Sequence, residues 1–291
     1  VITQKLQSKV IDLKKFFKNK DIKVKNFSIL NNSIYFDTEK LNIAKVQTLL
    51  DDDDSEINPY FQQYKSHQFD VEIQDNQFKF TFSRYGLVLL KNSSLDQAIE
   101  IVRKRVDEIG TNEPNILKRG NDRILVELPG LDNPDRIKAL LGKTANLTFQ
   151  FITSNNEESF GTEKLFSEDD SDEVVVSKRI IISGENLLDA KPHMDTLNNE
   201  TVVLFTLDRV GAKKFGKATT SGVGKRLAIV LDGVVISAPT IQEAIVTGTG
   251  QITGDFTFQT ATDLALLLRS GALPAPLNII EERTVGPDLG Q

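Results

Sequence analysis

Residues 94–130 read SLDQAIEIVRKRVDEIGTNEPNILKRGNDRILVELPG, and this stretch decides how the middle of the chain folds. Apolar residues recur at helical spacing over residues 95–109, and a glycine follows where helices commonly end. Ser94 stands three residues before a glutamine, which is the pattern of a capping box. Two short apolar segments then flank residues 120–122, a Gly-Asn-Asp turn. The stretch therefore predicts a helix that begins at Ser94, followed by a β-hairpin.

The neighbouring segments extend this pattern on both sides. LVLL at residues 87–90 precedes the helix and is typical of a short buried strand. Asn133 and Pro134 mark the start of a further helix, since proline is favoured in the first helical turn. NLTFQFI at residues 146–152 follows as another strand. Strand, helix, two strands, helix and strand form a split βαβ pattern, so residues 83–152 are predicted to be a ferredoxin-like base.

The first 82 residues are predicted to be an α/β extension of that base. Leu6, Val10, Leu13 and Phe17 lie at helical spacing in the opening segment. Alternating strands then flank two turn signals, Leu30-Asn31-Asn32 and Asp75-Asn76. These features indicate a helix and two hairpins in residues 1–82.

Residues 153–274 are predicted to form an inserted α+β head. They open on a polar, acidic surface loop over residues 153–172. Asp208 is placed to cap a helix, and Asp232-Gly233 separates two apolar strands as a hairpin turn. Residues 275–291 are expected to return to the base as a strand. The predicted fold is therefore α+β and two-lobed.

Composition and motifs exclude several function classes. The formal net charge is −6 and there is no cysteine, which argues against a nucleic-acid backbone binder and rules out thiol chemistry. Gly142-Lys143-Thr144 lacks the early glycine of a phosphate-binding loop. Asp51–Asp54 lacks the spacing of a calcium loop, and His67 and His193 have no second ligand at a useful spacing. We expect no catalytic residue, metal or cofactor, and no enzyme activity.

Four long segments stand out in order along the chain. They are RVDEIGTNEPNILKRGNDRILVELPG (105–130), LGKTANLTFQF (141–151), GKRLAIVLDGVVISAPTI (224–241) and DLALLLRSGALPAPLNIIEERTVGPDLG (263–290). Together they resemble the SecD family of protein-export subunits. The resemblance covers Ser94 to Gly290, and the first 82 residues are similar to a longer form of the family.

The resemblance implies a role late in protein export, on the periplasmic side of the bacterial inner membrane. Its implied partners are SecF, the SecYEG channel, YajC, the YidC insertase and unfolded preprotein. In the family, proton flow through membrane helices is thought to move the extracytoplasmic domain. This chain has no apolar run long enough for such a helix, so no proton-relay residue is assigned.

The leading hypothesis is a module that holds unfolded polypeptide weakly and moves against its base. A hinge is expected where the lobes join, at Thr153, Ser154, Leu273, Pro274, Ala275 and Pro276. Apolar residues that could contact polypeptide are Phe160, Phe166, Ile229, Leu231, Val234 and Ile236. For the run LAIVLDGVVISA a strand buried on both faces is the favoured explanation, and a groove that binds unfolded polypeptide is the alternative. A scaffold that docks partners without touching preprotein is the alternative, and an enzyme is a third hypothesis.

Overall fold

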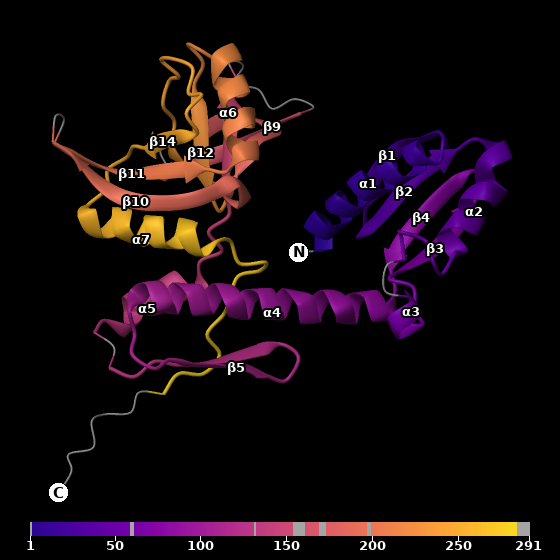
Figure 1. The fold of residues 1–291 in the computed structure, drawn as a ribbon, viewed down its shortest axis with the longest axis horizontal. Coiled ribbons are helices and arrows are strands. Elements are labelled where there is room, and N and C mark those ends of the chain that lie inside the picture. The colour runs from indigo at the N-terminus through magenta and orange to yellow at the C-terminus, as the bar shows by residue number, and fades with distance from the viewer. Residues whose placement is uncertain are drawn as a thin grey trace, which may run out of the picture. The chain divides into compact units, whose positions relative to one another are not determined.

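The computed structural model describes residues 2–58, 61–130, 132–153, 161–168, 173–196 and 199–283. The chain divides into two compact units. Unit 1 holds residues 1–96 with 119–123, and unit 2 holds residues 97–118 with 124–291. Helix α4 (Arg84–Ile109) contributes its first half to unit 1 and its second half to unit 2 (Figure 1).

Unit 1 contains a four-stranded antiparallel sheet in the order β1-β2-β4-β3. Asn31 and Asn32 both have positive φ at the first hairpin, and so does Asp75 at the second, which confirms both predicted turns. Besides the first half of α4, its elements are α1 (Ile2–Asn19), β1 (Val24–Leu30), β2 (Ser33–Thr38), η1 (Lys40–Asn42), α2 (Ile43–Asp51), α3 (Phe61–Tyr64), β3 (Phe69–Gln74) and β4 (Gln77–Phe82).

The core of unit 1 is rich in phenylalanine. Helix α1 buries Leu6, Leu13 and Phe17 completely, as its helical spacing predicts. Phe36 and Phe78 stack in the same cluster with their ring centroids 5.2 Å apart. Burial of these large rings is the main stabilising contribution in unit 1.

Unit 2 contains a closed barrel in the order β12-β13-β8-β9-β7 and a three-stranded sheet in the order β10-β11-β14. Helix α7 packs against β10 and β11 (Figure 1). Besides the second half of α4, the elements are β5 (Asn115–Arg119), β6 (Arg123–Glu127), α5 (Pro134–Gly142), β7 (Leu147–Ile152), β8 (Thr162–Ser167), β9 (Glu173–Ser183), η2 (Gly184–Asn186), β10 (Leu187–Asp195), β11 (Glu200–Leu207), α6 (Arg209–Ser221), β12 (Leu227–Leu231), β13 (Val234–Ser237), β14 (Thr249–Ile252) and α7 (Phe258–Ser270).

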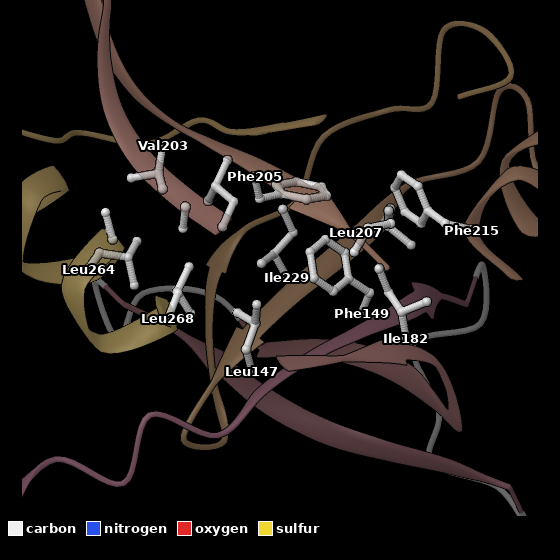
Figure 2. Packing of buried hydrophobic residues seen from close by; sticks show 14 of the residues in the cluster. Leu147, Phe149, Ile182, Val203, Phe205, Leu207, Phe215, Ile229, Leu264 and Leu268 are labelled. Carbon is white, nitrogen blue, oxygen red and sulfur yellow. The ribbon is translucent and has the colours of Figure 1, made fainter. Parts of the chain in front are cut away.

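The main core of unit 2 lies among one face of the barrel, the three-stranded sheet and α7. Figure 2 shows Phe149 and Ile229 of the barrel beside Phe205 of β11 and Leu268 of α7. A second, smaller cluster around Val176, Ala228 and Val230 takes the alternate residues of β12. Strand β12 is therefore buried on both faces, and the core explanation of its apolar run is confirmed.

The expected first strand of the base is wrong. LVLL lies within α4, which begins at Arg84 instead of Ser94. The Ser83 hydroxyl accepts a hydrogen bond from the Gly86 N–H (2.9 Å) and so takes the capping role at the true start. A four-residue apolar run has no periodicity of its own, so helix and strand cannot be told apart from it.

The ferredoxin-like sheet is not observed either. Strand β7 pairs with β9 and β12 inside the barrel, while β5 and β6 form a separate two-stranded sheet. Residues 277–283 form no strand, and Ile279 and Ile280 are exposed. The sequence identified β7 as a strand but could not identify its partners, because pairing depends on residues far away along the chain.

Strand β10 carries His193 beside Pro192. Proline is tolerated there because β10 is an edge strand of its sheet and a proline cannot donate to a second neighbour. The third strand of this sheet, β14, begins at Thr249.

Candidate functional site at the junction of the barrel

The chain enters the barrel through residues 143–146 and leaves α7 through residues 271–273, and we call these two crossings the junction. The crossings lie side by side, because the Leu273 N–H donates to the Thr144 carbonyl (2.8 Å). Both crossings follow helix ends: α5 ends at Gly142 and α7 ends at Ser270. The last carbonyls of a helix have no partner within the helix, so the junction brings together two sets of free acceptors.

The side chain of Arg105 satisfies these acceptors. It projects from α4 and is fully buried. Its Nη1 donates to the carbonyls of Leu140 (2.8 Å) and Leu141 (3.2 Å) at the end of α5. The remaining bonds run from Nη1 to Lys143 O, from Nη2 to Thr144 O and Gly271 O, and from Nε to Ser270 Oγ. One guanidinium thereby holds α4, both crossings and the ends of two helices.

Two electrostatic effects favour a cation at this position. The carboxyl ends of α5 and α7 carry partial negative charge, which a guanidinium complements. Burial lowers the pKa of Arg105 to about 10, while Asp232 acts in the opposite direction. Arg105 therefore remains charged at neutral pH, and its planar fork suits several carbonyls at once.

Asp232 fixes the first crossing from the other side. It lies in the predicted β12–β13 turn with positive φ. Its carboxylate accepts from the backbone N–H groups of Ala145 (3.0 Å) and Asn146 (2.8 Å). The hairpin turn is thus tied to the segment that leads into β7.

Two ion pairs flank the junction. Arg269 of α7 donates to both carboxylate oxygens of Glu108 on α4 (3.1 and 2.6 Å), and also to the carbonyl of Ala190. Arg136 of α5 pairs with Asp263 of α7 (2.5 Å between Nη2 and Oδ1). The bond from Arg269 lowers the pKa of the Glu108 carboxyl, and burial opposes this effect. These pairs are partly exposed, so their contribution to stability is smaller than that of Arg105.

The predicted hinge residues divide into two groups. Leu273 is buried within the second crossing, and Pro274, Ala275 and Pro276 follow it directly. Thr153 is not at a crossing: it follows β7 inside the barrel, and its N–H donates to the Val175 carbonyl (2.9 Å). Ser154 lies outside the described residues. The first crossing is therefore at residues 143–146, because β7 belongs to the barrel.

The predicted polypeptide-contact residues also divide. Ile229 is fully buried in the main core (Figure 2). Leu231 and Ile236 pack against that core. Phe166 and Val234 are aligned on the neighbouring parallel strands β8 and β13, and both are exposed, by 51% and 37%. Phe160 lies outside the described residues. Phe166 and Val234 form what we call the exposed pair.

Sequence reasoning missed Arg105, although a signal was present. Arg105 lies within the apolar stripe of its helix, between Val102 and Val106, and both of these are buried. A charged residue inside such a stripe is rarely buried unless it is fully hydrogen-bonded. Its position indicated a buried polar network, but it did not reveal the partners.

Within the described part of the chain, no group of three or more His, Cys, Asp and Glu side chains is placed to hold a metal ion. His67 instead contacts Asp53 (3.3 Å). None of the described helices combines the length and apolar character needed to cross a bilayer.

Two family models match the chain. Residues 95–154 match the N-terminal part of the P1 domain of protein translocase subunit SecDF, and residues 162–275 match the SecDF P1 head subdomain. The chain is also similar to solved SecDF structures. One is a membrane component SecDF that enhances protein export, at 32% identity and a TM-score of 0.56, covering 67% of this chain and 94% of that one. Another, SecDF in a super-membrane-facing form, has 33% identity, a TM-score of 0.56, and coverage of 65% of this chain and 28% of that one.

Curated relatives extend the similarity to the N-terminal segment. The SecD subunit of Rickettsia felis is 40% identical over 290 residues, which is 96% of this chain and 54% of that protein. The SecD subunit of Acetobacter pasteurianus is 42% identical over 231 residues, 77% of this chain and 44% of that protein. The chain spans about half the length of the Rickettsia relatives it matches. With both P1 models matched in order along the chain, and with curated SecD subunits similar over 96% of it, the chain belongs to the SecD family of protein translocase subunits.

Proposed function

We propose that this chain is the P1 region of a SecD-type subunit, that it lies on the periplasmic side of the inner membrane, and that it handles unfolded preprotein during export. The exposed pair on β8 and β13 makes weak contact with the polypeptide, and the junction transmits movement between α4 and the barrel. The observation that carries the proposal is the Arg105 network, which ties α4 to the end of α5 and to both crossings.

The geometry supports movement at the junction. The crossings are short, and the direct ties there are backbone and side-chain hydrogen bonds beside a small apolar cluster of Leu140, Ala145 and Leu267. Hydrogen bonds can be exchanged for bonds to water at a small net cost, whereas an apolar interface cannot be opened cheaply. Hinges of this kind are a few residues at the ends of elements.

The chemistry of the exposed pair supports weak binding. Phe166 and Val234 offer a small apolar surface, which suits many unfolded sequences without selecting one of them. A contact that must also release should be modest, with a dissociation constant of about 10⁻⁴ to 10⁻⁶ M. SecF, the SecYEG channel, YajC and YidC are the partners in this proposal, and proton flow outside this segment supplies the energy.

Fluorescence titration with a permanently unfolded polypeptide tests the binding step. We expect reversible binding to the 291-residue chain, lost on the double change Phe166→Ser and Val234→Ser. Val223→Ser is the matched control, because Val223 is also exposed (53%) but lies outside the exposed pair. Equal binding by both variants would remove the exposed pair from the proposal.

Crosslinking in the full-length protein tests the movement step. This chain has no cysteine, so in a full-length protein without other cysteines Glu108→Cys with Arg269→Cys gives a unique pair for a short bifunctional reagent. We expect the crosslink between α4 and α7 to slow export, and each single variant to leave it unchanged. Export at the normal rate with the crosslink in place would contradict movement at the junction.

The scaffold alternative has its own observation. Ile279 and Ile280 are exposed by 59% and 74% just beyond the second crossing. Crosslinks from these positions to partner subunits, without crosslinks from Phe166 to preprotein, would favour the scaffold. The proposal is a binding function without catalysis, so turnover of ester, peptide or prolyl substrates that is lost on one substitution would overturn it.

A further inference from the structure

A cavity of about 560 Å³ lies in unit 1, between α1 and the first part of α4. One polar face of α1 forms a wall, with residues at positions 5, 8, 9, 12, 15 and 19. Its volume is within the range of pockets that hold small molecules. Apolar side chains form the floor and the far side: Phe16, Ile57, Phe69, Phe82, Leu89 and Leu90.

Close packing fixes the far wall of the pocket. A Cβ atom on Gly86 would lie 2.1 Å from the Gln68 carbonyl oxygen, so only glycine allows α4 to approach this closely. Ser83 adds hydrogen bonds from its hydroxyl to the carbonyls of His67 (2.7 Å) and Gln68 (3.2 Å). The wall that carries Leu89 and Leu90 is therefore held in place by the start of α4.

Lysines gather on the pocket wall. Lys5, Lys9 and Lys15 line the pocket, and among the described residues none of the three has a carboxylate within ion-pairing distance. Residues 1–25 contain eight lysines and two aspartates, although the whole chain has a net charge of −6.

Lys9 is the most enclosed of the three lysines. Its ammonium donates to the Ile57 carbonyl (3.1 Å) and lies 5.4 Å from the centroid of the Phe69 ring. Burial lowers its pKa, and the charge of Asp12 partly offsets this effect. An ammonium has three N–H donors, and one carbonyl uses only one of them. A further acceptor in the pocket would bind the remaining N–H groups of Lys9 and so offset the free energy lost when the fold removes this ammonium from water.

We propose that this pocket binds an anionic amphiphile, with its carboxylate or phosphate headgroup at Lys9, Lys5 and Lys15 and its single alkyl chain on the Phe69, Phe82 and Leu90 floor. The headgroup forms charge-assisted hydrogen bonds with the lysines. The alkyl chain lies against the parts of these side chains that line the pocket; Phe69, Phe82 and Leu90 are 6–7% exposed, so most of their surface is already buried. Asp12 and Glu56 also line the pocket, which favours a headgroup of low charge.

A polypeptide fits this pocket less well. Its amide groups would need backbone partners, because buried N–H and C=O groups are rarely left unpaired. The backbone of the lining strands is already used: Phe69 pairs with Phe82, and the Gln68 carbonyl accepts from the Ser83 N–H. An alkyl chain has no N–H or C=O groups and so needs no hydrogen-bond partners in the pocket.

Isothermal titration of the 291-residue chain with decanoate and with dodecyl phosphate, each below its micelle concentration, tests this proposal. We expect saturable binding with one site per chain, and no comparable binding of decyl maltoside, dodecyltrimethylammonium or inorganic phosphate. Lys9→Met keeps most of the unbranched side chain, which becomes one atom shorter, and removes the charge, so affinity should fall about tenfold. Lys79→Met is the matched control, because Lys79 lies on β4 and does not line the pocket.

Several outcomes would overturn the proposal. These are the absence of saturable binding, equal binding of the neutral amphiphile, or unchanged affinity in Lys9→Met. Binding of an acidic unfolded peptide in place of either amphiphile would assign the pocket to a polypeptide and would also overturn it. Thermal melts of Lys9→Met show whether the variant is folded. A second variant, Lys5→Met with Lys15→Met, tests the headgroup contact should Lys9→Met fail to fold.

Discussion

Arg105 in unit 2 and Lys9 in unit 1 are two enclosed cations that differ in how their donors are used. The guanidinium of Arg105 is fully buried and makes hydrogen bonds to five carbonyls and one hydroxyl. The ammonium of Lys9 has one carbonyl and one aromatic ring. Burial lowers the pKa of both residues. The difference indicates that Arg105 supports the structure, while Lys9 is available to a ligand.

The largest expected effect is the loss of Arg105. Arg105→Met should lower the free energy of unfolding by about 3–5 kcal/mol, because it leaves buried carbonyls at two helix ends without donors. Urea unfolding at neutral pH measures this change. Arg103→Met is the matched control, since Arg103 is exposed on the same helix and pairs only with Glu100. If Arg105→Met lowered the free energy of unfolding by less than about 1 kcal/mol, water would be replacing the guanidinium. Arg105 would then not be a structural residue in contrast to Lys9.

A smaller effect of opposite sign is expected at Lys9. Lys9→Met should leave the unliganded protein as stable as before, or more stable by up to about 1 kcal/mol, because it removes a charge that the fold desolvates without full compensation. The folded-state pKa of Lys9 is lowered, so the unfolded state binds the proton more tightly. The destabilisation by the Lys9 charge is therefore complete below the folded-state pKa. It disappears as pH rises from the folded-state pKa toward the unfolded-state pKa of 10.5.

Urea unfolding of both proteins at neutral and at alkaline pH measures this difference. The gain in Lys9→Met should be greatest near pH 7 and should shrink in alkali. If Lys9→Met were clearly less stable than the wild type at neutral pH, Lys9 would be a structural residue like Arg105. The two cations would then not differ in role.

The smallest expected effect is at Glu108. Its folded-state pKa is lowered by the hydrogen bond from Arg269, so its contribution is present above the unfolded-state pKa near 4.5 and is lost as pH falls through the folded-state pKa. Because the pair is partly exposed, Glu108→Gln should cost at most about 0.5–1 kcal/mol at neutral pH. The difference from the wild type should vanish in acid. A difference that stays constant from pH 7 to pH 3 would show that the pair acts through packing instead of charge.

Unit 1 and unit 2 also differ in how well the sequence predicts them. In unit 1 two of the three strand pairings, β1 with β2 and β3 with β4, join sequence neighbours across turns such as Asn31-Asn32, so local patterns identify the hairpins. The third pairing, of β2 with β4, joins the two hairpins and is not local. In unit 2 strand β7 pairs with β9 and β12, and β13 pairs with β8 in parallel. These pairings join segments far apart in sequence, and local patterns do not identify them. The ferredoxin-like prediction failed for this reason.

The sequence by itself determined the α+β class, the family, the hairpin turns and the helix caps at Asn133 and Asp208. Each of these depends on residues within a few positions of one another, where backbone sterics and side-chain hydrogen bonds act locally. Only the tertiary structure decided that residues 87–90 are helical, that Arg105 meets the ends of α5 and α7, and that Lys9 lies over Phe69. Those outcomes depend on burial and on hydrogen-bond partners contributed by distant segments, which no local pattern contains.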